Sequence, residues 1–254
     1  IRNEFFRGIR YPYITNATPN KRHDGLNIAR GAHAVDENVL KTEINSKGNA
    51  VMKLESLARM NGFESSGAHS ALFDAELTVK VLGLIKKNQP QTWDTFLKTS
   101  NKSDTETIFK TKKMFTLAEY HFGNNYRFVV APLHPKFCIH PVYQWGQAFD
   151  LKIDPTPLFN MSISELKNAI KKLKFLRTIR SNKAPIILDP SYGMQVEPYS
   201  KLDPDLIKER AKLVNSNEKF SQNILTALRE TAEEKAQFES QIDLLAEETI
   251  YKKF

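Results

Sequence analysis

The sequence contains very little cysteine: Cys138 is the only one among 254 residues. One cysteine cannot form an intramolecular disulfide, so we expect a protein of a reducing, cytoplasmic compartment. Cys138 lies in the stretch HPKFCIH, close to His134 and His140. A structural zinc site normally has four ligands at regular spacings, and no second cluster completes this group. The pattern therefore favours a strand edge with scattered polar residues over a zinc site.

Long hydrophobic runs are also absent. No stretch approaches the roughly 18 apolar residues of a membrane-spanning helix. The first residues, IRNEFFRGIRYPY, alternate charged and aromatic side chains and do not resemble a signal peptide. We expect a globular protein without membrane contact. Because the sequence opens with Ile1 rather than methionine, we also expect a fragment or a processed product.

Negative charge is in the minority, with 29 Asp and Glu against 37 Lys and Arg, which gives a net charge of +8. This balance favours polyanionic partners, nucleic acid first. Residues 161–183 contain a single acid, Glu165, and seven basic residues: Lys167, Lys171, Lys172, Lys174, Arg177, Arg180 and Lys183. This segment could face nucleic acid or form an ordinary solvated surface, and the sequence does not decide between them.

Helical periodicity dominates residues 1–97. One predicted helix covers 52–60, with Gly62 suited to its C-terminal cap. A second runs from after Gly67 to the breaker Pro90. It carries two apolar stripes: Leu72, Ala75, Val79 and Leu82 on one, and Leu77, Val81, Leu84 and Ile85 on the other. A helix that is apolar on two sides is predicted to be buried.

The remaining chain changes character twice. Residues 98–113 are polar and without periodicity, which predicts a linker. Residues 114–200 contain short β-rich runs separated by Pro, Gly and Asn, which is typical of a small barrel. One helix interrupts them, beginning at a capping box formed by Ser162 and Glu165. Residues 201–254 are predicted to be helical.

The stretch GAHSALFDAE, residues 67–76, places His69 five residues before Asp74 where a loop becomes a helix. A carboxylate at the head of a buried apolar stripe is costly unless it is paired or binds a cation. The alternative is that the helix dipole stabilises the negative charge of Asp74 in the first turn, while His69 is a loop residue that forms a hydrogen bond with the backbone. The pair by itself leaves both readings open.

The longer string KLESLARMNGFESSGAHSALFDAELTVKVLGLI resembles the last motif of the DEDDh exonucleases, and within them the bacterial exodeoxyribonuclease I family. IRNEFFRGIRYPY resembles the segment after the third acidic motif of that family, and DGLNIARGAHAV resembles its next helix. YRFVVAPLHP and NKAPIILD resemble strands of its small barrel domain. The resemblance implies an α/β fold with a partial ribonuclease H-like exonuclease domain, followed by a small β-rich barrel domain and the start of an α-helical domain.

In the DEDDh family, four carboxylates hold two divalent ions, usually Mg²⁺ with Mn²⁺ as an alternative, beside the scissile phosphate. By resemblance, Asp74 falls on the last metal-ligating aspartate, and His69 on the histidine that deprotonates the attacking water. The family's Asp-x-Glu motif and its mid-sequence aspartate precede the segment that Ile1 matches. The resemblance therefore implies one metal ligand of four and a chain that is inactive alone.

The start of the sequence interleaves arginines with aromatic residues, a pattern suited to phosphate pairing and base stacking on a single strand. The alternative is that these phenylalanines are core and the arginines solvated. By resemblance, Arg2, Tyr13, Arg30 and Lys102 fall on positions that line the DNA path. Lys53 falls where the family has an arginine. A lysine keeps the positive charge but cannot form the two parallel hydrogen bonds of a guanidinium.

The resemblance implies a monomeric bacterial 3′-to-5′ exodeoxyribonuclease that acts on single-stranded DNA, releases 5′-mononucleotides and serves DNA repair or recombination. It also implies a protein partner, the acidic tail of bacterial single-stranded-DNA-binding protein. Two alternatives remain. One is a non-catalytic single-strand-binding module that retains the fold. The other is an RNA-trimming DEDDh exonuclease, which leaves the barrel segment unexplained.

Overall fold

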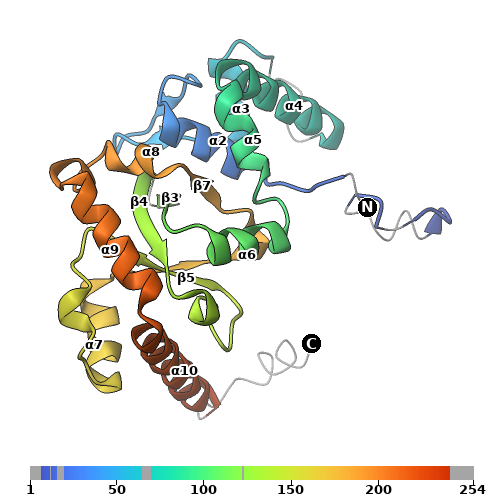
Figure 1. The fold of residues 1–254 in the computed structure, drawn as a ribbon. Helices are drawn as coiled ribbons and strands as arrows, with labels where there is room; N and C mark the ends of the chain where they lie inside the picture. Colours follow the sequence, from blue (N-terminus) through green and yellow to red (C-terminus); the bar gives the residue numbers. More distant parts are fainter. Residues whose placement is uncertain (1–6, 12, 16–19, 65–69, 122, 241–254) are drawn as a thin grey trace.

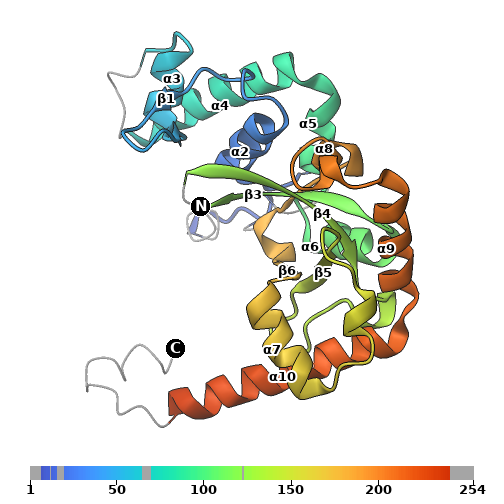
Figure 2. The same ribbon diagram turned by 90° about the vertical axis from the view of Figure 1, so that its left-hand side faces the viewer.

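A computed structural model of the chain describes residues 7–11, 13–15, 20–64, 70–121 and 123–240 (Figure 1). Four helices and a short hairpin lie at one end of the molecule, and a five-stranded sheet lies in the middle. Helices α7 and α10 lie at the other end (Figure 2). We call residues 20–98 the helical half and residues 102–240 the sheet half.

The helical half contains α2 Gly25–Val35, α3 Leu54–Met60, α4 Ala71–Asn88 and α5 Pro90–Leu97, with the hairpin β1 Glu43–Ile44 and β2 Ala50–Val51. Asp24 caps α2 by accepting from the backbone N–H groups of Leu26 and Asn27. α3 ends before Gly62, whose φ of 82° lies in the left-handed region, as its sequence predicts. A Cβ on Gly25 would lie 3.4 Å from Thr78, so the start of α2 packs closely on α4.

The two apolar stripes of α4 have different environments. Leu77, Val81 and Ile85 are buried, and Val81 and Ile85 belong to the core that α4 forms with α2 and α3. Leu72 and Val79 on the other stripe are 72% and 70% exposed. The prediction that both sides of this helix are buried is therefore wrong. Periodicity shows which residues share a face, but it cannot show whether a neighbour covers that face.

The sheet half is built on one antiparallel sheet with the strand order β6-β5-β4-β3-β7. Its strands are β3 Phe115–His121, β4 Asn124–Pro132, β5 Gly146–Asp150, β6 Leu176–Ile179 and β7 Ile186–Leu188. Each strand pairs antiparallel with its neighbour, and β6 and β7 form the two edges. The predicted barrel is thus an open sheet: short strands and turn residues specify the strands but not whether the edges meet.

The segment predicted as a linker, 98–113, forms helix α6 Lys102–Thr111. Its Thr105 and Phe109 are buried, and the Phe109 ring lies 6.2 Å from the Phe115 ring. Gly146 makes this packing possible, because a Cβ there would lie 2.2 Å from the Phe109 ring. A helix that buries only two of ten side chains carries too weak an apolar pattern to be recognised.

Helices cover the sheet on both sides and at its ends (Figure 1). They are α7 Ile163–Leu173, α8 Pro190–Met194, α9 Pro204–Ser216 and α10 Glu218–Ser240, with short 3₁₀ turns at Pro135–Phe137, Thr156–Leu158, Ser181–Lys183 and Tyr199–Lys201. The predicted capping box at the start of α7 is confirmed: Ser162 accepts from the Glu165 backbone, and the Glu165 carboxylate accepts from the Ser162 N–H. The described helices include none that is long and apolar enough to cross a membrane.

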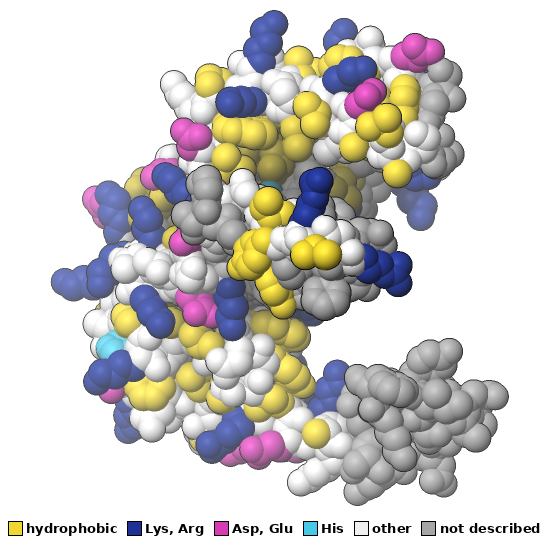
Figure 3. Space-filling view, turned by 90° about the vertical axis from the view of Figure 1, so that its right-hand side faces the viewer, with side chains coloured by type: hydrophobic (Ala, Val, Ile, Leu, Met, Phe, Trp, Pro, Cys, Tyr) yellow, Lys and Arg dark blue, Asp and Glu magenta, His cyan; other side chains and the backbone are white. Residues whose placement is uncertain are grey.

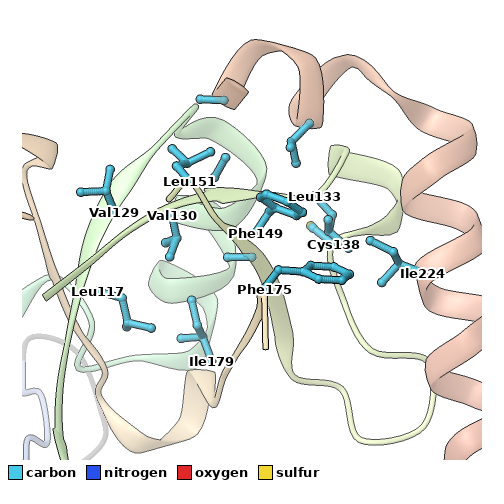
Figure 4. Close-up of a cluster of buried hydrophobic side chains, with 14 of the residues drawn as sticks. Leu117, Val129, Val130, Leu133, Cys138, Phe149, Leu151, Phe175, Ile179 and Ile224 are labelled. Atoms are coloured by element: carbon cyan, nitrogen blue, oxygen red, sulfur yellow. The ribbon is translucent and has the colours of Figure 1, made fainter. Parts of the chain in front are cut away.

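Two hydrophobic cores meet at strand β7. The core of the sheet half gathers aromatic and aliphatic side chains from β3, β4, β5 and α10 (Figure 4). Ile187 points into this core, whereas Ile186 and Leu188 point into the core of the helical half. Successive strand residues face opposite sides, so one short strand joins both cores. Gly31 lets α2 approach this strand, since a Cβ there would lie 2.9 Å from Ile186.

Candidate nuclease site and strand-binding surface

A pocket of about 1270 Å³ lies between α2, α3, α4 and the end of β3, and we call it the site pocket. It brings together three of the residues that the sequence singles out: Arg30 from α2, Lys53 before α3 and Asp74 from α4. These positions are up to 44 residues apart in the sequence. Their meeting follows from the packing of α3 and α4 against each other and of α2 on α4.

Asp74 stands in the first turn of α4, after the N-cap Ser70, whose hydroxyl accepts from the Phe73 N–H. Its backbone carbonyl accepts from the Thr78 hydroxyl at 2.8 Å, so the turn that carries it is regular. The Asp74 side chain is half-buried and lines the site pocket. The structure thus places this carboxylate at a pocket wall, next to the buried stripe that begins at Leu77.

Arg30 projects from the middle of α2, where its guanidinium carbon lies 4.5 Å from the centre of the Tyr120 ring. Tyr120 is itself fixed, because its hydroxyl donates to the carbonyl of Ala50 at 2.8 Å. The Arg30 Nε atom is buried and has no hydrogen-bond partner among the described residues. A guanidinium that lies over a ring and lines a pocket is suited to bind a phosphate through the donors that face the pocket.

Lys53 is exposed at the rim of the pocket, where it is the N-cap residue of α3. Deeper on α3, Ser56 donates to the Glu43 carboxylate at 2.7 Å, and Arg59 forms an ion pair with the same group. The hydrogen bonds from Arg59 and Ser56 lower the pKa of Glu43 below its ordinary value. Glu43 is therefore ionised and already bonded, and its role is to tie the β1–β2 hairpin to α3.

The carboxylates of the described residues do not form a complete magnesium site. Mg²⁺ takes octahedral oxygen coordination, in which carboxylates and water are the usual ligands. Asp74 and Glu55 line the pocket, and Glu43 is bonded to Arg59 and Ser56. Among the described residues, His, Cys, Asp and Glu nowhere gather in a group of three that could hold a metal ion. Asp74 can supply one ligand, and no reaction step follows from these residues alone.

The other predicted site residues lie elsewhere. His69 and Arg2 fall outside the described residues. Tyr13 is 47% exposed, with its ring 5.9 Å from that of Tyr11, and it does not line the site pocket. Lys102 begins α6, where it pairs with Glu106 at 3.5 Å, and it also lies outside the site pocket. The DNA-binding roles of these residues stay predictions.

A second pocket of about 600 Å³ adjoins the first, because Arg30 and Tyr120 line both. On its other side stand Arg180 and Lys183, and the Arg180 guanidinium lies 4.5 Å from the centre of the Trp145 ring. No sequence pattern marks Trp145 as a site residue. The only signal for this pocket was the positive charge of residues 161–183, which does not show where each side chain points.

The basic segment 161–183 divides into two parts. On α7, Lys167 forms ion pairs with Glu230 and Glu234 of α10, so this part of the segment joins two helices of the sheet half. The cations that face pockets come after the helix: Lys174, Arg177, Arg180 and Lys183. Figure 3 shows basic side chains over the whole height of one face of the molecule. α7 joins α10 through Lys167 and exposes Lys171 and Lys172, whereas the cations that line pockets lie on the residues that follow the helix.

The residues of HPKFCIH have structural partners. Cys138 is buried and directs its sulfur towards the Pro135 carbonyl, and burial raises the pKa of its thiol. His140 Nδ1 accepts from the backbone N–H groups of Val142 and Tyr143. This stretch forms a 3₁₀ turn followed by a short segment in which Ile139 pairs antiparallel with Gly146 of β5, so the predicted strand edge is present as an isolated bridge. The loop packs on the start of α10, since Lys136 pairs with Glu218 at 3.1 Å.

No family model matches the chain. It is 27% identical over 239 residues to exodeoxyribonuclease I of Buchnera aphidicola subsp. Acyrthosiphon pisum, covering 88% of this chain and 56% of that protein. It is 28% identical to the Haemophilus influenzae exodeoxyribonuclease I, covering 80% of this chain and 46% of that protein. The chain therefore spans about half the length of the curated relatives that it matches.

Solved structures show the same likeness at the level of the fold. Escherichia coli exonuclease I in complex with a dA16 oligonucleotide superposes with a TM-score of 0.64 at 22% identity, over 90% of this chain and 51% of that one. A complex named ExoI/SSB-Ct gives a TM-score of 0.63 over the same shares. The agreement in sequence and in fold confirms the resemblance to bacterial exodeoxyribonuclease I that the motifs of this chain indicate.

Proposed function

We propose that this chain is the strand-binding part of an exonuclease that hydrolyses single-stranded DNA from its 3′ end and releases 5′-mononucleotides, in DNA repair or recombination. The observation that carries the proposal is the convergence of Asp74, Arg30 and Lys53 on one pocket. The similarity to exodeoxyribonuclease I supports the substrate. In this proposal, residues 1–97 are the C-terminal part of a ribonuclease H-like domain, and residues 201–254 begin a helical domain.

Each residue of the pocket has a proposed task. Arg30 binds a phosphate with the donors that its stacking on Tyr120 leaves available, and Lys53 adds a single positive charge at the rim. Asp74 contributes one carboxylate to a magnesium site whose remaining ligands lie outside the described residues. When bound, the ion would supply positive charge beside the phosphodiester. Arg2, Tyr13 and Lys102 are proposed further strand contacts, and His69 is the proposed base.

A second candidate function is a non-catalytic module that binds single strands. It is favoured by one observation: Arg30 and Lys53 line the site pocket, yet the described part of the chain gathers no three metal-binding side chains. Both candidates predict binding of single-stranded DNA by a monomer. They differ only in whether nucleotides are released. The acidic tail of single-stranded-DNA-binding protein is a proposed partner for either, supported by the ExoI/SSB-Ct complex of the structural neighbour.

Binding and release should be measured separately on the purified chain. For binding, fluorescence anisotropy with labelled single-stranded DNA, duplex DNA and RNA should show preference for the DNA single strand. Arg30→Ala should weaken this binding roughly 10-fold or more, because a hydrogen bond to a charged group contributes about 1.5–3 kcal/mol. Arg229→Ala, which removes an exposed guanidinium on α10, is the matched control and should bind like the parent. Equal binding of all three nucleic acids would contradict the substrate assignment, and preference for RNA would favour the RNA-trimming alternative.

For release, mononucleotides should be measured from single-stranded DNA with and without Mg²⁺. Asp74→Ala should remove any magnesium-dependent release while leaving the dissociation constant for DNA nearly unchanged, since Asp74 contributes to hydrolysis rather than to strand affinity. Asp94→Ala, an exposed acid of α5, is the control. Magnesium-dependent release by this chain, or by a longer protein that contains it, would exclude the non-catalytic module. Binding without release by such a longer protein would favour that module. Release that survives Asp74→Ala would refute the role of this carboxylate.

A further inference from the structure

Tyr120 lies near the end of β3, in the sheet half, and its side chain reaches into the helical half. Ala118 and Tyr120 are two residues apart on β3, so their side chains face the same side of the strand. Both pack against the core of the helical half, whereas Leu117, on the other side of the strand, belongs to the core of the sheet half. The alternation of the strand therefore directs the Tyr120 ring towards the site pocket, which it lines.

The ring of Tyr120 holds the side chain of Arg30. The guanidinium carbon of Arg30 lies over the ring, 4.5 Å from its centre. In the described part of the chain, no acceptor reaches the buried Nε atom of Arg30. An arginine side chain has several rotatable bonds, and a cation–π contact with a fixed ring limits its conformations. The guanidinium is therefore held at the pocket before any ligand binds.

The hydroxyl of Tyr120 reaches a second element of the site pocket. It donates to the carbonyl of Ala50 on β2 at 2.8 Å. The three residues that follow Ala50 line the site pocket, and the last of them is Lys53. The hydrogen bond thus fixes the strand that leads to the second cation of the pocket. One side chain contacts Arg30 with its ring and the approach to Lys53 with its hydroxyl.

A second contact beside the Tyr120 ring fixes how α2 lies on the strands. Asn125 on β4 is directly opposite Tyr120, so the two side chains share a face of the sheet. The Asn125 amide donates to Nδ1 of His33 at 2.6 Å. His33 and Arg30 are three residues apart on α2, so they lie on the same side of that helix. Two neighbouring contacts therefore hold α2 against the ends of β3 and β4.

The turn between β3 and β4 also lies against the β1–β2 hairpin. Gly123 in this turn has a φ of 87°, and a Cβ there would lie 2.5 Å from the side-chain nitrogen of Asn49. Asn49 directly precedes Ala50, whose carbonyl accepts from Tyr120. The sheet half thus contacts two consecutive residues of the hairpin, which limits the movement of β2 relative to the Tyr120 ring.

We propose that Tyr120 is a positioning residue of the strand-binding site, which holds Arg30 and the strand leading to Lys53 in the arrangement that binds phosphates. The inference rests on the proposed function, and it adds that a residue of the sheet half determines the affinity of the site pocket. The guanidinium covers one face of the ring and the hydroxyl is bonded, so Tyr120 acts through Arg30. Cations that are ordered in advance lose less conformational freedom when a ligand binds.

The first test needs no DNA. In spectra of the chain labelled with ¹⁵N-arginine, the Arg30 Nε–H proton should resonate upfield, because the guanidinium lies over the face of a ring; Arg30→Ala identifies the signal. Tyr120→Leu should move it downfield, whereas Tyr120→Phe should keep it, since phenylalanine retains the ring. Phe238→Leu removes an exposed ring from α10 and should leave the signal unchanged. The same signal in the parent and in Tyr120→Leu would overturn the proposal.

The second test is the binding of labelled single-stranded DNA, measured by fluorescence anisotropy. Tyr120→Leu should raise the dissociation constant roughly 3- to 10-fold, the effect of a partly exposed cation–π contact. Tyr120→Phe should recover most of this loss and bind within about twofold of the parent, because the ring is retained. Phe238→Leu should bind like the parent. Should Tyr120→Leu fail to fold, Tyr120→Met removes the ring and keeps a long apolar side chain.

A double-mutant cycle separates a positioning role from a direct contact with the strand and from general support of the fold. In Arg30→Ala, the further change Tyr120→Leu should alter the dissociation constant by less than about twofold, because the side chain that Tyr120 holds is already absent. Equal losses with and without Arg30 would mean that Tyr120 touches the strand itself or only supports the fold, and the proposal would be wrong.

The outcomes distinguish this inference from the proposed function. No binding by the parent chain would overturn the proposed function and the role of Tyr120 in strand binding with it, whatever the arginine spectra show. Binding by the parent chain that Tyr120→Leu leaves within about twofold would overturn the role of Tyr120 alone.

Discussion

The site pocket of the helical half and the surroundings of Asp150 in the sheet half differ in how they hold a carboxylate. The Asp150 carboxylate is completely buried and bonded to Arg177, Lys152 and Tyr199. The Asp74 carboxylate, the proposed metal ligand, is half-buried and lines the site pocket. The first carboxylate is enclosed by the structure, whereas the second lies at the wall of a pocket.

The apolar surfaces of the two halves are alike. α10 of the sheet half buries Phe220 and exposes Phe238, and α4 of the helical half buries Leu77 and exposes Leu72. A helix with one buried and one exposed apolar side occurs in both halves. The comparison teaches that the halves differ in the surroundings of their carboxylates rather than in their apolar surface.

The largest effect is expected from Asp150→Ala, which would break the network of the sheet half. The change leaves the Arg177 guanidinium and the Tyr199 hydroxyl without their buried acceptor. Removing one partner of a buried charge pair costs about 3–5 kcal/mol. We expect the free energy of unfolding to fall by that amount in urea titrations. The exposed Asp94→Ala should change it by less than about 0.5 kcal/mol. Similar small losses in both variants would show that the network contributes little.

A slightly smaller effect should separate the two stripes of α4. Leu77→Ala removes a completely buried side chain and should lower the free energy of unfolding by about 2–5 kcal/mol. Leu72→Ala changes a side chain that is 72% exposed and should alter it by less than about 0.5 kcal/mol. The same urea titrations measure both. A substantial loss in Leu72→Ala would mean that the exposed stripe is covered in solution, which would contradict the comparison.

These two stripes also mark how far the sequence predicts the structure. Local signals were sufficient for the capping box at Ser162 and for the end of α3 before Gly62, because each depends on a few neighbouring residues. The stripes of α4 are equally clear in the sequence, yet only one is buried. α6 was missed because only Phe109 and the partly buried Ile108 supply large apolar side chains to the core. Burial and sheet closure depend on partners distant in the sequence, which no local pattern specifies.

The same limit applies to predicting the candidate site from the sequence. The resemblance named Asp74, Arg30 and Lys53 because short motifs surround them, and the structure brings these three residues to one pocket. The contact between the Arg177 guanidinium and the Phe128 ring had no such signal. In the sequence, Phe128 is an ordinary strand residue and Arg177 is one cation of a basic segment. Only the register of β4, β5 and β6 places the guanidinium on the ring.

A change in stability of intermediate size is expected where α2 packs on β7, which is the contact between the two halves. A Cβ at Gly31 would lie 2.9 Å from Cγ2 and 3.0 Å from Cγ1 of Ile186, a β-branched side chain buried on β7. Gly31→Ala should therefore cost about 1–3 kcal/mol by overpacking. Gly83→Ala lies in a helix with open space around it and should instead stabilise by about 0.5–1 kcal/mol. Thermal unfolding should show a lower midpoint temperature for Gly31→Ala and a higher one for Gly83→Ala. Stabilisation by both changes would mean that α2 can move away from β7 at no cost.

The smallest expected effect is on the pH dependence of stability, through a histidine at the contact between the two halves. His33 on α2 is 7% exposed, and its Nδ1 accepts from the side-chain amide of Asn125 on β4 at 2.6 Å. Burial lowers the pKa of His33 below its ordinary value of 6.5, although Glu37 and Asp36 oppose the shift. The buried ring is therefore held in its neutral form, and it links the two halves as a hydrogen-bond acceptor.

The sign of the effect follows from proton binding. Because the pKa of His33 is lower in the folded chain than in the unfolded one, the unfolded chain takes up the proton first as the pH falls below 6.5. The contribution of His33 to stability is complete above that pH and is lost as the pH falls towards the folded-state pKa. Burial lowers the pKa of His140 in the sheet half as well, so both halves contribute to the loss.

Urea titrations at about pH 7, 6 and 5 would measure this loss, in the range where histidine ordinarily titrates. His33→Gln removes the contribution of the contact between the halves and His140→Gln that of the sheet half, so each variant should show a shallower decline than the parent. No single histidine can contribute more than about 1.4 kcal/mol per pH unit. If the decline in His33→Gln is as steep as in the parent, His33 is protonated as readily in the folded chain as in the unfolded one. In that case the contact with Asn125 does not depend on a neutral ring, and the two halves are joined by the apolar packing of Gly31 on Ile186 rather than by this hydrogen bond.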